Sequence, residues 1–424
     1  MAYKAEIFDL WQHLCGEIFE PLIRCGIDFE GRVDETILKQ AVTASLKTIP
    51  IIGCGFGGTA NRPRWVEKGF TGKDIVRVVE SWQNSEDDVL KCLSSGIDFP
   101  NEPQLKIFIV RKIKDDTLCV IISHAVCDGA GFKRYLYLLG EIYTKLKNNH
   151  PIILPAFCPR GVKPLFAGIP MKEKMRILFT DYNAYSSANK TNQRGVGFQS
   201  CGSETVMKRQ IISSEEFNRL KHFAKAEGVT INDCLMALFA RVFCKNTDTD
   251  RILLPSTIDL RKFIPPNRAY GIGNYSSNCM CVIPVRPEDT LIDTVKRVAK
   301  QMDAHKSDKG ILKSVMLWGL AARAPWFLLK WGFPKYAVQP VVSFTNLGII
   351  DMSKLKFDNL YIKYAYLTAS IKPRPYLQLT ASTFNDCCTL GFNIYGSEKD
   401  KQFVCTMLGD MRKEIKEIGK QAQT

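Results

Sequence analysis

The sequence predicts a mixed α/β protein built from two halves, and its length, composition and periodicity support this prediction. The chain has 424 residues, which is long for one hydrophobic core and comfortable for two domains. Hydrophobic residues make up 46% of the chain and charged residues 24%, as in ordinary globular proteins. Both halves contain runs typical of β-strands and runs of helical periodicity. A stretch rich in Pro, Asn, Ser and Gly, at 148–200, is the best candidate for a linker.

The first half begins with a short strand that leads to Val33 and Asp34. A helix follows, because Leu38, Val42 and Leu46 lie on one face at helical spacing. The elements predicted after it are a turn-rich hairpin at 50–68, a second hairpin formed by 104–112 and 117–123, and an amphipathic helix at 130–149.

The second half begins with two predicted helices. Ser213 and Glu216 fit a capping box at the start of the first helix, and Gly228 fits its end. Thr230 and Asp233 fit a second capping box ahead of an apolar helix. The elements predicted after these are strands at 251–262, 274–285, 341–350, 359–367, 376–384 and 389–395, and a closing helix at 400–423.

One apolar segment, 315–334, has the length of a transmembrane helix. It contains Arg323 and Pro325 near its middle and Lys330 towards its end, and a charge at the bilayer centre costs about 2.5–3.5 kcal/mol. We therefore expect a helix that covers the core or lines an apolar cavity, with peripheral membrane contact as the lesser alternative. The amino-terminal residues 1–14 contain charges and lack a long apolar core, so they do not predict a secretory signal.

The fifteen cysteines are scattered, and no Cys-x-x-Cys occurs. The only close pairs are Cys279 with Cys281 and the adjacent Cys387 and Cys388, and neither pair has the usual spacing of metal ligands. We therefore expect reduced, mostly buried thiols in a cytoplasmic protein, and no metal site. The net charge is +15, but Lys and Arg are spread along the chain. This distribution disfavours nucleic acid and favours an anionic cofactor or carrier as partner.

A lone histidine lies at the junction between a predicted strand and a predicted helix. His124 follows the run at 117–123, which is apolar on both faces as expected for a central strand, and Asp128 and Gly129 precede the helix at 130–149. A neutral imidazole accepts a proton near neutral pH, so a histidine facing a cleft can act as a general base. Asp128 can orient the loop by bonding to His124 or by pairing with an arginine elsewhere, and Gly129 permits a positive φ or a close backbone approach. The alternative is a core histidine that the backbone of the turn satisfies.

The segment 124–129 resembles the His-x-x-x-Asp-Gly motif of the chloramphenicol-acetyltransferase-like superfamily. That superfamily includes alcohol O-acyltransferases, polyketide-associated acyltransferases, wax ester synthases and the condensation domains of nonribosomal peptide synthetases. Further segments resemble the family in the same order along the chain. They are the strand–helix step at 31–42, the helix start with Thr230, Asn232 and Asp233, the stretch with Arg261, Gly273 and Asn274, and the strand with Thr345, Asn346, Leu347 and Gly348.

The sequence departs from three branches of that family. Condensation domains and wax ester synthases usually have two adjacent histidines, whereas Ser123 occupies the first of these positions here. The Asp-Phe-Gly-Trp-Gly motif of the plant enzymes is absent. These departures favour a stand-alone acyltransferase with a single histidine.

The resemblance implies two similar α/β subdomains, each with a mixed sheet, that meet along a tunnel. The expected division is an amino-terminal subdomain at 1–160, a linker or crossover at 161–200 and a carboxy-terminal subdomain at 201–424. The roles that the resemblance implies are His124 as the base at mid-tunnel, Asp128 and Gly129 as structural support, Arg261 as the ion-pair partner of Asp128, and Asn346, Ser343 or Asn274 as oxyanion donor or tunnel wall.

The implied activity is transfer of an acyl group from a coenzyme A or carrier-protein thioester to an alcohol or amine. Acyl-CoA, or an acyl group on the phosphopantetheine of an acyl carrier protein, would then be a substrate, with no bound cofactor and no metal. We expect a cytoplasmic monomer that does not bind nucleic acid. Two alternatives stay open: an amide-forming, condensation-domain-like protein that acts with a carrier protein, and a non-catalytic binding relative of the same fold.

Four other side chains are rival candidates for the chemistry. Cys127 lies within the motif and could act as a thiol nucleophile paired with the histidine. His13 could border a cavity. Tyr270 and Tyr275 flank the glycine–asparagine turn and either line the tunnel or only pack.

Overall fold

The protein is described from a computed structural model. The structure describes residues 1–424 apart from 60–61, 83–84, 157, 181–203, 337–339 and 422–424. Part of the linker predicted for 161–200, and the turn of the hairpin predicted for 50–68, lie outside the described residues.

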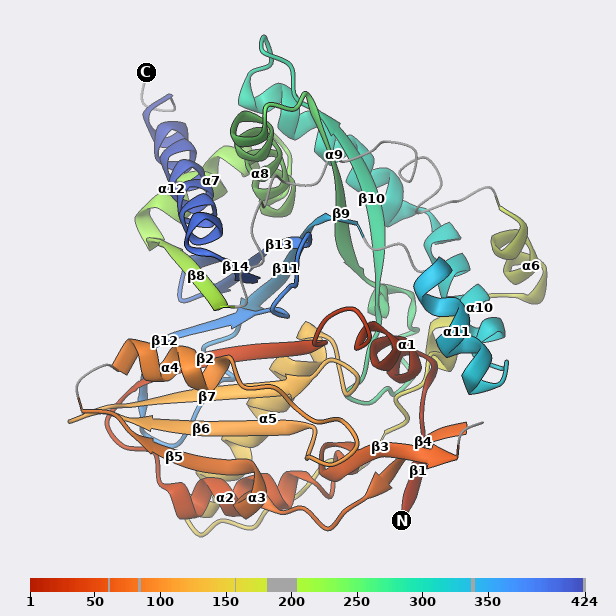
Figure 1. Ribbon diagram of the computed structural model, residues 1–424, viewed down its shortest axis with the longest axis vertical. Helices are drawn as coiled ribbons and strands as arrows, with labels where there is room; N and C mark the ends of the chain where they lie inside the picture. The colour runs from red at the N-terminus through yellow and green to blue at the C-terminus, as the bar shows by residue number, and fades with distance from the viewer. Residues whose placement is uncertain (60–61, 83–84, 157, 181–203, 337–339, 422–424) are drawn as a thin grey trace.

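Two large sheets form two lobes. The lobe of the first sheet lies in the lower part of Figure 1, and the lobe of the second sheet lies in the upper part. The first sheet contains β2 (Leu22–Glu30), β5 (Val76–Glu80), β6 (Leu105–Arg111), β7 (Asp116–Ser123) and β12 (Tyr361–Thr368), in the order β12-β2-β7-β6-β5. The second contains β8 (Glu204–Ile212), β9 (Arg251–Asp259), β10 (Ser276–Pro284), β11 (Val342–Ile350), β13 (Leu377–Phe384) and β14 (Cys387–Gly396), in the order β10-β9-β11-β13-β14-β8. A small third sheet has the order β1-β4-β3 and consists of β1 (Ala2–Lys4), β3 (Cys54–Thr59) and β4 (Arg62–Glu67).

Both large sheets are mixed, as predicted. In the first, β5 runs parallel to β6 and the remaining pairs are antiparallel. In the second, β11 runs parallel to both β9 and β13, and the remaining pairs are antiparallel. The mixed α/β class predicted from the sequence is therefore confirmed.

The strand that precedes His124 is central, as its composition predicts. β7 lies between β2 and β6 and is buried along its whole length. Leu118 and Val120 pack in a core with the helices α2 (Glu35–Ser45) and α5 (Gly129–Lys147), whereas Cys119 and Ile121 pack in a separate cluster with α4 (Ser85–Leu93). Because helices cover both faces of the sheet, both sets of side chains in β7 must be apolar.

β12 joins the sheet of the first lobe although it comes late in the chain. It pairs antiparallel with β2, where Tyr366 lies opposite Gly26. A Cβ atom at position 26 would approach the Tyr366 ring to 2.6 Å, so only glycine leaves room for this ring. The four strands predicted in succession at 341–395 are thus all present but divided between two sheets. The boundaries at 160 and 201 stay a prediction, because residues 181–203 are not described.

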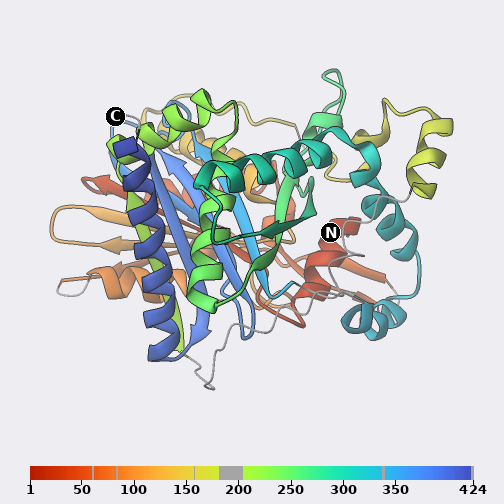
Figure 2. The same cartoon turned by 90° about the horizontal axis from the view of Figure 1, so that it is seen from above.

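The second sheet is covered by α7 (Ser214–Ala226), α8 (Ile231–Thr247), α9 (Leu291–Ser307) and α12 (Glu398–Gln421). Figure 1 shows these helices above the strands, away from the first lobe, and Figure 2 shows them in front of the strands when the molecule is seen from above. Both predicted capping boxes are confirmed at the starts of α7 and α8. Gly228, between these two helices, has φ +67°, as a helix stop requires.

The segment 315–334 does not form one helix, so that part of the prediction is wrong. α10 (Leu312–Ala321) ends before Pro325, and α11 (Trp326–Tyr336) begins immediately after it. A proline inside a helix removes a backbone donor and clashes with the preceding turn, which is why the chain breaks there. Within the described residues, no helix combines the length and the apolar character needed to cross a membrane.

The other α-helices are α1 (Ile7–Cys15), α3 (Gly72–Ile75) and α6 (Met171–Phe179).

Fourteen cysteines are described, all with free thiols, and only Cys158, Cys387 and Cys405 among them are not buried. The prediction of free, mostly buried thiols is confirmed for these fourteen residues.

Candidate active site

His124 lies between the two lobes, at the point where β7 ends and before α5 begins. Its backbone N–H donates to the carbonyl of Pro21 at 2.7 Å, and its ring borders a cavity of about 460 Å³. Both lobes and the helices α1 and α10 contribute to this cavity. Its walls include His124, Gly129 and Lys133 from the first lobe, Thr257, Asn274, Ser343 and Asn346 from the second, and Trp11, Cys15, Val315 and Trp318 from the two helices.

The ring of His124 is held by one asparagine from the second lobe. The Asn274 Nδ2 atom donates to the backbone carbonyl of His124 at 2.8 Å, which fixes the orientation of the amide. The Asn274 Oδ1 atom therefore faces His124 Nδ1 at 3.1 Å and can only accept. Nδ1 must then carry the proton, and Nε2 carries the lone pair. This is the tautomer that a general base needs.

Burial lowers the pKa of His124 below its ordinary value. Contacts with its own backbone, Asp128 and Asn274 raise the pKa again, and the charge of Lys372 lowers it further. The net effect keeps the ring neutral at physiological pH. A neutral ring is able to accept a proton, which fits the base that the sequence predicts.

Asp128 braces three separate segments. One carboxylate oxygen accepts from the backbone N–H of Gly131 at 2.9 Å and caps α5. The other accepts from the backbone N–H of Tyr275 at 2.8 Å. Arg261 pairs with both oxygens, at 2.8 and 3.0 Å, and also donates to the carbonyl of Gly273 at 3.1 Å. The ion pair that the resemblance implied is present, and it ties the helix after His124 to the loop that carries Asn274.

The two glycines that open α5 allow close packing rather than unusual backbone angles. Gly129 does not have a positive φ, so of the two roles predicted for it the close approach applies. A Cβ atom there would come within 2.7 Å of the Leu347 side chain. At Gly131 the limit is stricter, because a Cβ atom would lie 2.7 Å from the Cβ of Cys127 and 3.0 Å from the carbonyl of Gly273.

Arg160 is a second brace, which the sequence did not indicate. Its guanidinium donates to the carbonyls of Ala125 and Val126 at 3.0 and 2.7 Å, directly after His124 in the chain. It also pairs with Asp9 of α1 at 2.8 Å, and Asp9 in turn accepts from the Trp65 indole at 2.8 Å. Arg160 is buried, and it lies in the stretch predicted as a linker on composition alone. Its role therefore depends on long-range contacts that leave no local pattern.

The residues expected on the opposite wall do face the cavity. Asn346 and Ser343 lie on β11 and line it. The Asn346 side chain accepts from the backbone N–H of Gly348 at 2.9 Å and donates to Asn232 at 3.4 Å. Two of the segments that carry the family resemblance, the helix start with Asn232 and the strand with Asn346, thus meet in space. Asn274 also lines the cavity, but its amide is engaged with His124.

The rival candidates lie outside the cavity. Cys127 is fully buried, and burial raises the pKa of its thiol, so a thiolate nucleophile is disfavoured there. His13 stacks on Phe56 with ring centroids 4.2 Å apart, and burial lowers its pKa to about 4. Tyr275 is fully buried, and Tyr270 lines a separate cavity of about 580 Å³.

The protein matches known proteins in structure but not in sequence. No protein-family model matches the sequence, and no curated protein matches it. Solved structures match almost the whole chain. Polyketide synthase associated protein 5 from Mycobacterium tuberculosis has a TM-score of 0.69 at 13% identity, and the match covers 98% of this chain and 99% of that one. The first condensation domain of the calcium-dependent antibiotic synthetase has a TM-score of 0.67 at 13% identity, covering 98% and 95%.

A third match is the trichothecene 15-O-acetyltransferase from Fusarium sporotrichioides, with a TM-score of 0.68 at 12% identity, covering 97% of this chain and 94% of that one. The chain has the chloramphenicol-acetyltransferase-like fold. The two-lobed α/β fold predicted from the family resemblance is therefore confirmed, and the tunnel stays a prediction; identities of 12–13% carry nothing further by themselves. The structure adds that His124, Asp128 and Gly129 border the cavity between the lobes.

Lys372 is a further titratable group in the cavity that the sequence did not indicate. Its Nζ atom lies 3.2 Å from the centroid of the Phe19 ring and faces the same cavity as His124. In the described part of the chain, no carboxylate forms an ion pair with it. Burial lowers the pKa of Lys372 to about 7, and the nearby Cys15 raises it slightly. An amine in this state adds positive charge to the cavity only at neutral pH and below.

Asn274→Ala is expected to lower the turnover number by roughly 10²-fold with little change in KM, because the ring of His124 would lose its orientation. Nitrogen-resolved NMR of the histidine rings should show a mixture of tautomers at His124 in the variant and a single tautomer in the wild type. Asn278→Ala is the matched control, since Asn278 lines the same cavity and is not bonded to His124. A single tautomer in Asn274→Ala would contradict this assignment.

Lys372→Met is expected to raise the pKa of His124. Lys372 is charged below about pH 7, so its charge is present where His124 titrates and disfavours the imidazolium. Its removal should move the titration of the His124 ring to higher pH, as measured by NMR, and move the acid limb of the pH–rate profile in the same direction. Lys372→Arg keeps the charge and should leave both unchanged. An unaltered titration in the methionine variant would rule out this coupling.

Proposed function

We propose that the protein transfers an acyl group from a thioester to an alcohol or amine, with His124 as the general base. The observation that carries this proposal is the Nε2 lone pair of a neutral histidine, set by Asn274, at a cavity that both lobes line. The three similar structures named above include an acetyltransferase and a condensation domain, and both names fit an acyl-transfer reaction.

In the proposed reaction His124 acts twice and ends unchanged. Nε2 takes the proton of the acceptor hydroxyl or amine while that oxygen or nitrogen attacks the thioester carbonyl. A tetrahedral oxyanion forms and then collapses, which breaks the carbon–sulfur bond. The proton on Nε2 passes to the leaving thiolate. No covalent acyl-enzyme is required, in keeping with the buried thiol of Cys127 and its raised pKa.

The oxyanion needs a hydrogen-bond donor on the far wall of the cavity. We assign this role to Ser343, which lines the cavity from β11, ahead of Asn346. The amide of Asn346 is bonded to Gly348 and Asn232 and is better suited to holding the strand end. The positive groups Lys133 and Lys372 in the same cavity support a donor that carries phosphate, as acyl-CoA and acyl phosphopantetheine do.

The proposal is tested by finding the acyl donor and the acceptor. The purified protein would be offered a panel of acyl-CoA thioesters and of acyl carrier proteins, each with mixtures of alcohols and amines, and the products would be read by mass spectrometry. We expect an ester or amide that forms with stoichiometric release of thiol. Amide formation only from carrier-bound donors would favour the condensation-type alternative. Saturable binding of thioesters without any turnover would overturn the proposal in favour of a binding protein.

Three further expectations belong to this proposal: action as a monomer, in the cytoplasm, and without a bound cofactor. The last follows from an activity in which acyl-CoA or a carrier-bound acyl group is a substrate, and the cytoplasmic location follows from the free, mostly buried thiols.

A further inference from the structure

A group of sulfur and nitrogen ligands lies in the second lobe, away from His124. Cys279 and Cys281 are two residues apart on β10, so their side chains point to the same face of the sheet. Met302 and His305 are three residues apart on α9 and lie on one face of that helix. α9 packs on β10, which brings the two pairs together. We call these four residues the β10–α9 cluster.

The ligand atoms of the cluster lie close enough together to hold a metal ion. The ligand atoms of Cys279, Cys281 and His305 all lie within 4.8 Å of one another. The Met302 sulfur is 3.8 Å from the Cys279 sulfur and 3.6 Å from the Cys281 sulfur. Two sulfur ligands held about 2.3 Å from a tetrahedral ion are themselves about 3.8 Å apart. Both distances from the Met302 sulfur therefore match edges of such a tetrahedron.

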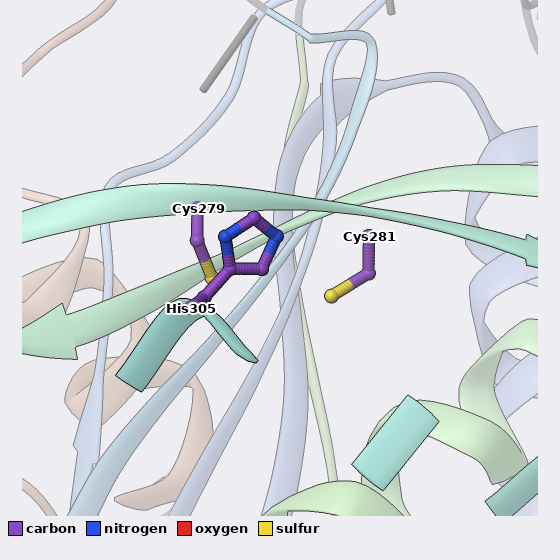
Figure 3. Close-up of side chains that lie close together, drawn as sticks. All are labelled: Cys279, Cys281 and His305. Atoms are coloured by element: carbon purple, nitrogen blue, oxygen red, sulfur yellow. The ribbon is translucent and has the colours of Figure 1, made fainter. Parts of the chain in front are cut away.

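The imidazole of His305 lies between the two cysteine sulfurs in Figure 3. Its Nε2 atom donates to the backbone carbonyl of Met280 at 2.9 Å, so Nε2 carries the proton and Nδ1 carries the lone pair. Histidines that bind metals almost always donate their other N–H to a carbonyl or carboxylate, which orients the ring. The residue that supplies this carbonyl, Met280, is the one between the two cysteines. The strand thus provides both the thiols and the orienting contact.

The cluster is largely buried but has a route of entry. Cys279, Cys281 and Met302 are buried, and His305 is only partly exposed. A cavity of about 800 Å³ reaches the cluster, since Met302 and Lys306 form part of its wall. Four protein ligands leave no open position, which is typical of a structural site rather than a catalytic one.

We propose that the β10–α9 cluster binds one thiophilic metal ion with a filled d shell, Zn²⁺ or Cu⁺. Cysteine and methionine sulfurs with an imidazole are the donors that these ions prefer, and hard ions such as Mg²⁺ prefer oxygen. β10 is one of the two edge strands of the second sheet, and α9 packs on it. The bound ion would tie helix to strand and stabilise the second lobe, because an ion that binds only the folded state shifts the folding equilibrium.

The full-length protein would be reduced, freed of metal with a chelator and titrated with Zn²⁺ or with Cu⁺ under anaerobic conditions. We expect one equivalent to bind and the thermal midpoint to rise. A competition between the two ions, read by elemental analysis, would show which is retained. Cobalt binding should give a thiolate-to-metal charge-transfer band and the visible spectrum of a tetrahedral site. This spectrum is measured on the wild type, so it does not depend on whether any variant folds.

The variants locate the ion. Cys279→Ser with Cys281→Ser, and separately His305→Gln, should abolish stoichiometric binding and the rise in thermal midpoint. Cys387→Ser with Cys388→Ser is the matched control, a close cysteine pair on β14 outside the cluster, and should bind as the wild type does. Binding that survives both cluster variants, absence of any binding, or a tetrahedral cobalt spectrum without thiolate bands would each overturn the proposal. So would a disulfide mapped by peptide mass spectrometry to Cys279 and Cys281 after mild oxidation in the presence of Zn²⁺, since the disulfide would then outcompete the ion.

Discussion

Replacing His124 with alanine is expected to reduce acyl transfer by roughly 10²–10⁴-fold, the usual contribution of a general base. The physical reason is that Nε2 of His124 both removes the acceptor proton and returns it to the thiolate. The thermal midpoint should change little by comparison, because His124 is partly exposed and, among the described residues, its ring is hydrogen-bonded to Asn274 alone. The measurement is initial rate against thioester concentration for the donor found in the panel.

His222→Ala is the control for this prediction, since His222 is an exposed histidine on α7. It should have wild-type activity. Cys127→Ser tests the rival thiol mechanism and should also retain activity, with no acylated protein seen by mass spectrometry during turnover. A His124→Ala protein that keeps wild-type turnover would remove the basis for the proposed function.

Arg261→Ala is expected to lower the free energy of unfolding by about 3–5 kcal/mol, because it leaves the buried carboxylate of Asp128 without its counter-charge. The two side chains are only 10% and 6% exposed. Burial alone would lower the pKa of Arg261, but the carboxylates of Asp128 and Asp259 raise it above its ordinary value, so the arginine stays charged. Chemical denaturation of the wild type and the variant measures the difference.

A double-mutant cycle separates the ion pair from the other duties of Asp128. Asp128→Ala also leaves the backbone N–H groups of Gly131 and Tyr275 without an acceptor, so it should destabilise in its own right. The double variant should lose less than the sum of the two singles, with a coupling of about 0.5–3 kcal/mol. Arg219→Ala is the control, because Arg219 pairs with an exposed glutamate on α7, and it should cost less than about 0.5 kcal/mol. Additive losses at the buried pair would contradict the assigned contact.

The elements that the sequence predicts well are those with local causes. The capping boxes at Ser213 and Thr230 involve residues three apart, and the hairpin of β6 and β7 joins neighbouring strands, so both can be predicted from a short window. β12 shows what a short window of sequence cannot predict. Its apolar alternation marks it as a strand, but its pairing with β2 depends on Gly26, which lies more than 300 residues earlier and leaves room for Tyr366.

The candidate site divides in the same way. His124 and Asp128 are recognisable because their spacing follows from the turn between β7 and α5. The part that Asn274 plays was not predicted, since the amide reaches His124 from 150 residues away. Arg160 and Lys372 carry no local pattern, and only the packing of the lobes brings them to the loop after His124 and to the cavity.

The β10–α9 cluster shows the same limit most clearly. The spacing of Cys279 and Cys281 along the chain predicted no metal site, because metal ligands in sequence motifs usually come in wider pairs. The remaining donors, Met302 and His305, come from a helix that packs on the strand, and a spacing argument cannot include them. By itself, the sequence determined which segments form helices and strands and where the histidine motif lies, because these depend on neighbouring residues. Only the tertiary structure decided what surrounds His124 and the two cysteines, because burial, tautomer and ligand geometry arise where distant segments pack together.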